Sequence, residues 1–268
     1  MPQKDYQLKK SLGQHFLHNE SLCQKIVEEV NKTPHLQLLE IGPGAGALTK
    51  YLLEWDDCNY KAIEIDNEKV QYLLQNYPAI NDKIIAVDFL KASVPFEGHF
   101  SIIGNFPYNI STQILFKVLD WKQQVDEVIG MFQKEVAQRV ASKEGNKTYG
   151  ILSVLIQTFF KVEYLFDVAP GNFTPPPKVM SGILKLTNAQ NPYEIKEKGK
   201  YIRFVKAAFS QRRKTLRNAL KSSFQTELLQ DKIFDKRAEQ LSVSDFVALF
   251  NDLNSSSSHN ETNRISSH

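Results

Sequence analysis

The sequence of residues 38–46 is LLEIGPGAG, an apolar run that ends in three glycines. The apolar part is typical of a buried parallel strand, and residues 47–53 after the glycines have the pattern of a helix. Glycines let the backbone turn tightly and let a ligand approach the main chain, while the first N–H groups of the helix lack intrahelical partners. We therefore expect a cofactor to bind at this strand-to-helix turn.

The spacing of the glycines bears on which cofactor that is. Gly42, Gly44 and Gly46 follow the pattern G-x-G-x-G, whereas the dinucleotide fingerprint is G-x-G-x-x-G. The third small residue of the fingerprint would fall on Ala47, and alanine is accepted at that place. The motif alone therefore leaves an NAD-dependent enzyme open, although the chain has no evident partner for hydride transfer.

Strand and helix patterns alternate on both sides of this turn, as far as about residue 188. Strands are predicted over residues 36–41, 60–65, 83–87, 101–103, 125–132, 162–166 and 180–186. Helices are predicted over residues 21–30, 47–53, 68–75, 111–119, 134–140 and 149–160. The alternation predicts an α/β fold, with a mostly parallel, doubly wound, Rossmann-like sheet that forms a first domain over residues 1–190.

The pattern changes after a polar linker. Only helical patterns follow it, over residues 201–209, 213–222, 235–242 and 244–253. We therefore expect a small all-helical domain over residues 191–253. Residues 254–268 are rich in Ser, Asn and His and cannot bury enough apolar surface to offset their ordering entropy, so we expect a disordered tail.

The composition argues against several classes of protein. The two cysteines, Cys23 and Cys58, cannot form a framework of several disulfides and lack metal-ligand spacing, so we expect no metal. No apolar run approaches the roughly 20 residues of a membrane span, and the basic N-terminus lacks the apolar region of a secretory signal. We expect a cytoplasmic protein that does not bind membranes.

Acidic residues end the two strands that follow the glycine turn. Glu64 lies where a carboxylate can accept hydrogen bonds from both hydroxyls of a ribose, with Asp66 as the second choice. Asp88 can accept a hydrogen bond from the amine of an adenine, and Phe89 beside it can pack on the ring. Because ligands of open α/β sheets bind at the carboxyl ends of the strands, these residues predict a nucleoside site.

The fourth predicted strand runs into residues 104–112, GNFPYNIST. This turn is close to the [DNS]-P-P-[YF] pattern that marks methylation of amino groups. Asn105 Oδ1 and a backbone carbonyl near Phe106 or Pro107 can accept both N–H groups of an adenine amine, which localises the lone pair on its nitrogen. Pro107 donates no N–H, and Tyr108 can stack on the base. These four residues are the candidate catalytic group.

Five stretches make the chain resemble the KsgA/RsmA-type small-subunit ribosomal RNA adenine N6,N6-dimethyltransferases, over nearly its whole length to about residue 253. They are residues 10–17 (KSLGQHFL), 40–46 (EIGPGAG), 104–112 (GNFPYNIST), 172–179 (NFTPPPKV) and 209–218 (FSQRRKTLRN). The resemblance implies an enzyme that uses S-adenosyl-L-methionine to dimethylate N6 of two adjacent adenosines near the 3′ end of small-subunit (16S) rRNA, during biogenesis of that subunit.

The resemblance also implies roles for single residues. Contacts to the cofactor would come from His15, Leu17, Gly42, Gly44, Glu64, Asp88 and Asn105. Phe173, on a loop stiffened by three prolines, would close on the adenine opposite Tyr108. The chain has His15 where Asn is common, and Phe106 where Leu is common. A larger side chain beside the base would tighten a pocket that must admit a first methyl group, and dimethylation is still expected.

A basic segment leads into the predicted helical domain. Residues 196–217 hold nine Lys or Arg and the single acid Glu197, although the net charge of the chain is only +3. Charge alone favours a solvated helix face over a phosphate-binding surface. The resemblance favours RNA, bound through Arg212, Arg213, Lys214 and Arg217. The expected partner is small-subunit rRNA within a 30S assembly intermediate, and we expect the protein to be a monomer.

Two rival functions stay open from the sequence. A large-subunit rRNA dimethylase of the antibiotic-resistance type shares the fold and the Asn-x-Pro-Tyr turn, although residues 212–218 and the three prolines favour the small subunit. A non-enzymatic assembly or transcription factor could also keep the fold. Residues 42–46, Glu64 and residues 105–108 are intact, which argues against such a loss of catalysis.

Overall fold

The computed structural model describes residues 15–189, 193 and 195–265, with only the backbone of residues 256–265. The first five residues of the motif at 10–17 and the last three of the predicted tail lie outside the described residues. Within the described part, no helix combines the length and apolarity needed to cross a membrane. The same residues contain no cluster of His, Cys, Asp and Glu arranged to hold a metal ion.

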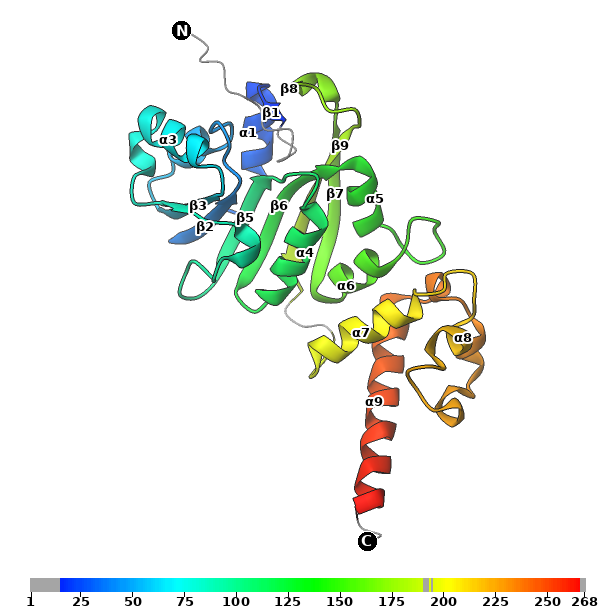
Figure 1. The fold of residues 1–268 in the computed structure, drawn as a ribbon. Helices are drawn as coiled ribbons and strands as arrows, with labels where there is room; N and C mark the ends of the chain where they lie inside the picture. The colour runs from blue at the N-terminus through cyan, green and yellow to red at the C-terminus, as the bar shows by residue number, and fades with distance from the viewer. Residues whose placement is uncertain (1–14, 190–192, 194, 266–268) are drawn as a thin grey trace. The chain divides into compact units, whose positions relative to one another are not determined.

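The chain divides into two compact units, and the first contains the described residues 15–137 and 162–188. A seven-stranded sheet forms the centre of this first unit (Figure 1). Its strands are β2 (Leu36–Ile41), β3 (Cys58–Glu64), β4 (Ile84–Ala86), β5 (Phe100–Asn105), β6 (Val125–Gln133), β7 (Phe160–Val168) and β9 (Ser181–Asn188). Their order is β4-β3-β2-β5-β6-β9-β7, the first five are parallel, and β9 runs antiparallel to β6. The predicted α/β, Rossmann-like sheet is confirmed.

The central strands are apolar because both of their faces are covered. Leu38 and Leu39 in β2 and Ile102 and Ile103 in β5 are fully buried, as expected for parallel strands between layers of helices. The helices of this unit are α1 (Glu20–Glu28), α2 (Thr49–Leu52), α3 (Asn67–Asn76), α4 (Ser111–Asp120) and the first part of α5 (Lys134–Val140). Figure 1 shows α4 lying in front of the sheet.

The strand register brings four strand ends to one edge of the sheet. Ile41 is paired with Ile63, Glu64 with Ala86, and Glu40 with Ile103. The carboxyl ends of β2, β3, β4 and β5 therefore meet, and the segments that follow these strands lie beside one another. This is the place where open α/β sheets bind their ligands.

A second, two-stranded sheet joins distant parts of the first unit. β1 (Phe16–Leu17) pairs antiparallel with β8 (Phe173–Thr174). The backbone N–H of His18 donates to the carbonyl of Asn172 at 3.0 Å, and Asn19 Nδ2 donates to Asn172 Oδ1 at 2.7 Å. Asn19 also caps α1 by accepting from the N–H of Leu22. Strand pairing and hydrogen bonds thus join the described end of the N-terminal motif (residues 15–17) to the proline-rich segment (residues 172–179).

The division of the chain into two units differs from the predicted boundary at residue 190. Residues 138–161 group with residues 189 onward rather than with the sheet. They contain α6 (Ile151–Phe159), in which seven of the nine residues are buried. A helix that is apolar nearly all round needs partners on several sides. In the second unit, α6 packs on Tyr201 through the Phe159 ring, and Thr158 Oγ1 lies 2.9 Å from the Tyr201 hydroxyl.

The second unit is helical but less regular than predicted. It contains α6, α7 (Lys198–Ala208), α8 (Leu216–Leu220) and α9 (Val243–Ile265). The helix predicted over residues 235–242 is wrong, because that region forms separate 3₁₀ turns at Lys232–Asp235 and Ala238–Gln240. The predicted disorder from residue 254 also differs from the structure, in which α9 continues to Ile265. Extending a helix that is already packed at Phe246 and Phe250 avoids the cost of nucleation.

Candidate cofactor and acceptor site

A cavity of about 230 Å³ lies at the carboxyl edge of the sheet. It is lined by β1, the glycine turn after β2, the end of β3, residues 87–90 after β4 and residues 105–110 after β5. All the residues predicted to contact the cofactor line it: His15, Leu17, Gly42, Gly44, Glu64, Asp88 and Asn105. The structure therefore gathers into one site residues that lie far apart in the sequence.

The glycine turn has the backbone conformation that its sequence predicts. Gly42 has φ of +68° and Gly44 has φ of +59°, a left-handed conformation that other residues rarely adopt. The N–H of Gly42 donates to the carbonyl of Ile63 at 2.9 Å, which ties the turn to the end of β3. The turn is thus held against the next strand while it lines the cavity.

Glu64 is fixed by backbone N–H groups rather than by a cation. Its Oε1 accepts from the N–H groups of Ile65 (2.9 Å) and Asp66 (3.0 Å), and its Oε2 accepts from the N–H of Gly44 at 3.2 Å. Burial raises the pKa of this carboxyl, and the backbone hydrogen bonds act in the opposite direction. A carboxylate has about four lone-pair positions, so with three N–H groups accepted Glu64 keeps about one position, on Oε2, for a ribose hydroxyl.

The structure favours Glu64 over Asp66 as a residue that lines the cavity, and Phe89 lines the cavity as well. Asp66 does not line the cavity, and its side chain caps α3 by accepting from the N–H of Glu68 at 3.1 Å. Asp88 lines the cavity and accepts from the N–H of Leu90 at 3.0 Å. The Phe89 ring is buried and meets Trp121 edge-on, with 5.2 Å between centroids, so packing holds it in the core.

Two apolar side chains at this site were missed from the sequence. Ile65 is 53% exposed and Val87 is 38% exposed, and both line the cavity beside Glu64 and Asp88. Exposed aliphatic side chains at the ends of adjacent strands can form two walls around a flat ring. The signal was present, because each stands next to an acid at a strand end, but neither residue type by itself indicates a ligand.

A second buried acid, Glu40, lies behind the glycine turn. Its Oε2 accepts hydrogen bonds from Thr49 Oγ1, at 2.8 Å, and from the hydroxyl of Tyr60. Burial raises the pKa of Glu40 from 4.5 to about 7, against the lowering effect of these two donors. Glu40 also lines the cavity, so a titratable group near neutrality borders the predicted cofactor site.

Asn105 presents its side-chain oxygen at the end of β5. Its Nδ2 donates to the carbonyl of His15 at 3.2 Å, while Oδ1 accepts no hydrogen bond from any residue that the structure describes. His15 is itself held by Nδ1, which donates to the carbonyl of Pro175 at 2.8 Å. The amide is therefore oriented by its nitrogen, and its oxygen remains available as an acceptor.

Tyr108 is held in place through its hydroxyl and through its ring. Its hydroxyl is hydrogen-bonded to Ser181 Oγ, the first residue of β9, and its ring lies 5.6 Å from the His15 ring at an interplanar angle of 32°. Burial raises the pKa of the phenol. Ser181 is a further site residue that no sequence pattern indicates, because only the fold brings it beside Tyr108.

Phe106 lines the cavity, but most of its side chain belongs to the core. Its side chain is only 1% exposed, and its ring meets Phe132 edge-on at a centroid distance of 5.1 Å. A Cβ atom added at Gly104 would fall 2.7 Å from the Phe106 ring, and one at Gly130 would fall 2.5 Å from Phe132 and closer still to Phe106. Phe106 therefore fills the space that two strand glycines leave in the core.

Phe173 also lies elsewhere than predicted. It pairs with Leu17 in the small sheet, is 2% exposed and belongs to the hydrophobic core of the first unit. It does not line the cavity that contains Tyr108. The pairing of β1 with β8 turns the ring inward, so in this structure Phe173 stabilises the site from the core.

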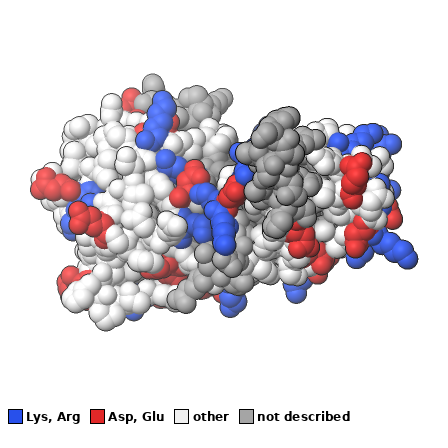
Figure 2. All heavy atoms as spheres, turned by 90° about the horizontal axis from the view of Figure 1, so that it is seen from below, with Lys and Arg blue, Asp and Glu red and all other residues white. Residues whose placement is uncertain are grey.

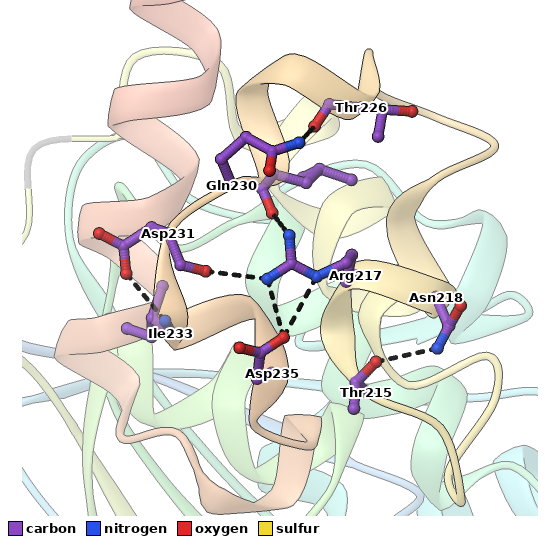
Figure 3. Close-up of polar contacts among 9 residues, drawn as sticks. Thr215, Arg217, Asn218, Thr226, Gln230, Asp231, Ile233 and Asp235 are labelled. Atoms are coloured by element: carbon purple, nitrogen blue, oxygen red, sulfur yellow. Dashed lines mark hydrogen bonds and ion pairs between the residues drawn. The ribbon is translucent and has the colours of Figure 1, made fainter.

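The predicted RNA-binding cations have different surroundings. Arg217 is used inside the second unit, where its guanidinium contacts Asp235 and the carbonyls of Leu229 and Asp231 (Figure 3). Arg217 therefore has partners within the second unit, and its contact with RNA stays a prediction. Arg212 donates to the carbonyl of Lys147.

The remaining two predicted cations, Arg213 and Lys214, are exposed. Figure 2 shows Lys and Arg interspersed with Asp and Glu on the visible face, without one continuous basic surface there. On that face, binding of RNA would depend on a few neighbouring Lys and Arg side chains rather than on a broad positive electrostatic potential.

The sequence matches a family model described as ribosomal RNA adenine dimethylase over residues 6–255. A protein of Cytophaga hutchinsonii named ribosomal RNA small subunit methyltransferase A is 51% identical, over 91% of this chain and 96% of its own length. A protein of the same name from Flavobacterium johnsoniae is 52% identical, over 90% of this chain and 94% of its own length.

Solved structures agree with this match. A dimethyladenosine transferase from Plasmodium falciparum superposes with a TM-score of 0.78 at 25% identity, covering 90% of this chain and 98% of its own. The 23S rRNA methyltransferase ErmE superposes with a TM-score of 0.65 at 24% identity, covering 89% and 99%, and shows the same fold. With a family model that spans nearly the whole chain and relatives at half identity, this protein belongs to the ribosomal RNA adenine dimethylase family.

Proposed function

We propose that this protein is an S-adenosyl-L-methionine-dependent methyltransferase that dimethylates N6 of adenosines in small-subunit rRNA. Its targets are two adjacent adenosines near the 3′ end. Membership of the adenine dimethylase family and the names of the half-identical relatives support the reaction and the subunit. The observation that carries the proposal is the Asn105 amide, whose nitrogen is anchored while its oxygen remains an open acceptor beside the cavity.

The residues around the cavity fit this cofactor. Glu64 has about one lone-pair position left for a ribose hydroxyl, and Asp88 can accept from the amine of an adenine. The exposed side chains of Ile65 and Val87 offer apolar contact to the flat ring between these acids. When bound, the cofactor supplies an electrophilic methyl group on a sulfonium.

The chain's own residues activate and orient the acceptor. Asn105 Oδ1 and a nearby backbone carbonyl accept the two N–H groups of the adenine amine, which moves its lone pair out of conjugation with the ring. Tyr108, fixed by Ser181 and His15, provides a face for the base. Positioning supplies most of the acceleration, and no general base with a perturbed pKa is needed before transfer.

The substrate is proposed to be rRNA within a 30S assembly intermediate, bound by the protein as a monomer in the cytoplasm. Arg213 and Lys214 in the second unit are exposed cations that can contact phosphates. Such contacts position RNA without reading its sequence, so the choice of target depends on the shape of the assembling subunit.

Mass spectrometry of rRNA treated with cofactor and either wild type or Asn105→Ala tests this proposal. Wild type is expected to produce dimethyladenosine in immature small subunits and none in large subunits. The Asn105→Ala variant is expected to lose roughly a hundredfold or more in rate, by comparison with loss of a transition-state hydrogen bond elsewhere. Asn81→Ala, an exposed asparagine away from the cavity, is the matched control and should be as fast as wild type.

The outcomes separate the rival functions. Modification of large subunits alone would identify a large-subunit enzyme, and RNA binding without any methyl transfer would identify a binding protein. A fast Asn105→Ala variant would leave the reaction assigned but remove the mechanism given to its amide.

A further inference from the structure

The second unit contains a cavity of its own, separate from the cofactor site. It has a volume of about 310 Å³ and lies among α7, the segment after α8 and α9. That volume is at the lower end of the range for small-molecule sites. All of its lining residues belong to the second unit.

Three phenylalanine rings form the inner part of this cavity. Phe204 meets Phe224 edge-on at a centroid distance of 6.0 Å, and Phe250 lies 5.8 Å from Phe204 at a tilted angle. Phe204 and Phe250 are almost completely buried, whereas Phe224 is half-buried. Core packing thus fixes the position of two rings, and the third reaches both the cavity and the solvent.

Cations stand at the outer part of the same cavity. Lys200, Arg203, Phe204 and Ala207 share one face of α7, since residues three and four apart are neighbours on a helix. Arg203 is exposed, and Lys200 forms a surface ion pair with Glu197 at 2.6 Å in which both side chains are roughly half exposed. Surface pairs of this kind are weak, so a phosphate can replace Glu197 as the partner of Lys200.

We propose that this cavity receives one unstacked nucleotide of the substrate RNA, with its base on the phenylalanine rings and its phosphate at Arg203 and Lys200. The inference rests on the proposed function for the identity of the RNA. Single-stranded RNA is recognised by stacking of splayed bases on aromatic side chains, next to cations that follow the backbone. An apolar side chain of a partner protein would use the rings but give the cations no counterpart, so charge complementarity favours the nucleotide.

Binding of small-subunit RNA by single variants tests the proposal. Phe224→Ala should weaken binding about tenfold, in the range for loss of one base–aromatic contact, whereas Phe224→Tyr keeps a ring and should bind like wild type. Arg203→Ala should weaken binding and lower the slope of log affinity against log salt by about one. The control is Lys232→Ala, which removes an exposed cation of the same unit outside the cavity. It should bind small-subunit RNA like wild type and leave the methylation rate unchanged.

A photoreactive benzoyl-phenylalanine at position 224 gives a readout that does not depend on the stability of Phe224→Ala. Bound to immature small subunits, it should cross-link to one unpaired nucleotide. Cross-links to a ribosomal protein, or wild-type affinity of both Phe224→Ala and Arg203→Ala, would overturn the inference while methylation by wild type continued. A wild-type protein that neither bound nor methylated small-subunit RNA would remove the proposed function and this inference together.

Discussion

Arg217 donates two hydrogen bonds to one oxygen of Asp235, from Nε at 3.2 Å and from Nη2 at 2.7 Å. The same guanidinium donates to the carbonyls of Leu229 and Asp231, as Figure 3 shows. One side chain on α8 therefore satisfies backbone and carboxylate acceptors across residues 229–235. This segment has only short 3₁₀ turns of its own, so the contacts of Arg217 add to the burial of Leu229 and Phe234 in holding it.

Removing this side chain should destabilise the second unit. We expect Arg217→Ala to lower the free energy of unfolding by about 1–3 kcal/mol, because the hydrogen bonds of a charged group to Asp235 and to two backbone carbonyls are lost. Arg213→Ala, an exposed arginine nearby, should leave stability within about 0.5 kcal/mol of wild type. Urea unfolding of the two variants measures the difference. Wild-type stability of Arg217→Ala with weakened RNA binding would place Arg217 in the RNA-contacting set.

Glu40 should make stability depend on pH. Burial raises its pKa from 4.5 to about 7, so between these values the folded protein holds a proton that the unfolded chain releases. Its stabilising contribution is complete below pH 4.5 and is lost as the pH rises toward 7, with a slope of up to about 1.4 kcal/mol per pH unit. Glu40→Gln keeps an acceptor for Thr49 and Tyr60 but cannot titrate.

Urea unfolding at several pH values between 5 and 8 measures this effect. The difference in stability between wild type and Glu40→Gln should fall as the pH rises to about 7 and level off above it. Glu127, whose pKa burial also raises, is present in both proteins and cancels in the difference. A difference that is flat with pH would show that the Glu40 carboxyl is ionised throughout.

The sequence predicted those parts of the site whose causes are local. The glycine turn, Glu64, Asp88 and Asn105 each stand at a strand end, and strand ends follow from apolar runs and from the residues that stop them. The directions of side chains were not predictable in this way. Phe106 turns toward the space left by Gly130 on the next strand, and Arg217 turns toward an acid 18 residues away. Such choices depend on which segments become neighbours after folding.

The Phe106 ring and Gly130 should be coupled in stability. Gly130→Ala places a methyl group against the Phe106 and Phe132 rings and should destabilise the first unit by about 1–3 kcal/mol, as expected for overpacking. Adding Phe106→Leu makes room, so the double variant should be more stable than Gly130→Ala alone. Thermal unfolding of the two single variants and the double variant gives the coupling energy. Purely additive effects would mean that the core relaxes elsewhere.

The hydrogen bond between Tyr108 and Ser181 should matter for catalysis through the position of the ring. Tyr108→Phe and Ser181→Ala each remove that bond but keep the ring, so we expect each to lower kcat/KM for rRNA by less than tenfold. Tyr108→Ala removes the stacking face as well and should cost roughly 10- to 100-fold. If the two hydroxyls act only through each other, the double variant Tyr108→Phe, Ser181→Ala should be no slower than the slower single variant. Methyl transfer to immature small subunits, measured with labelled cofactor, gives the rates of wild type and of these four variants. A double variant in which the two single losses multiply would show that Tyr108 and Ser181 act independently.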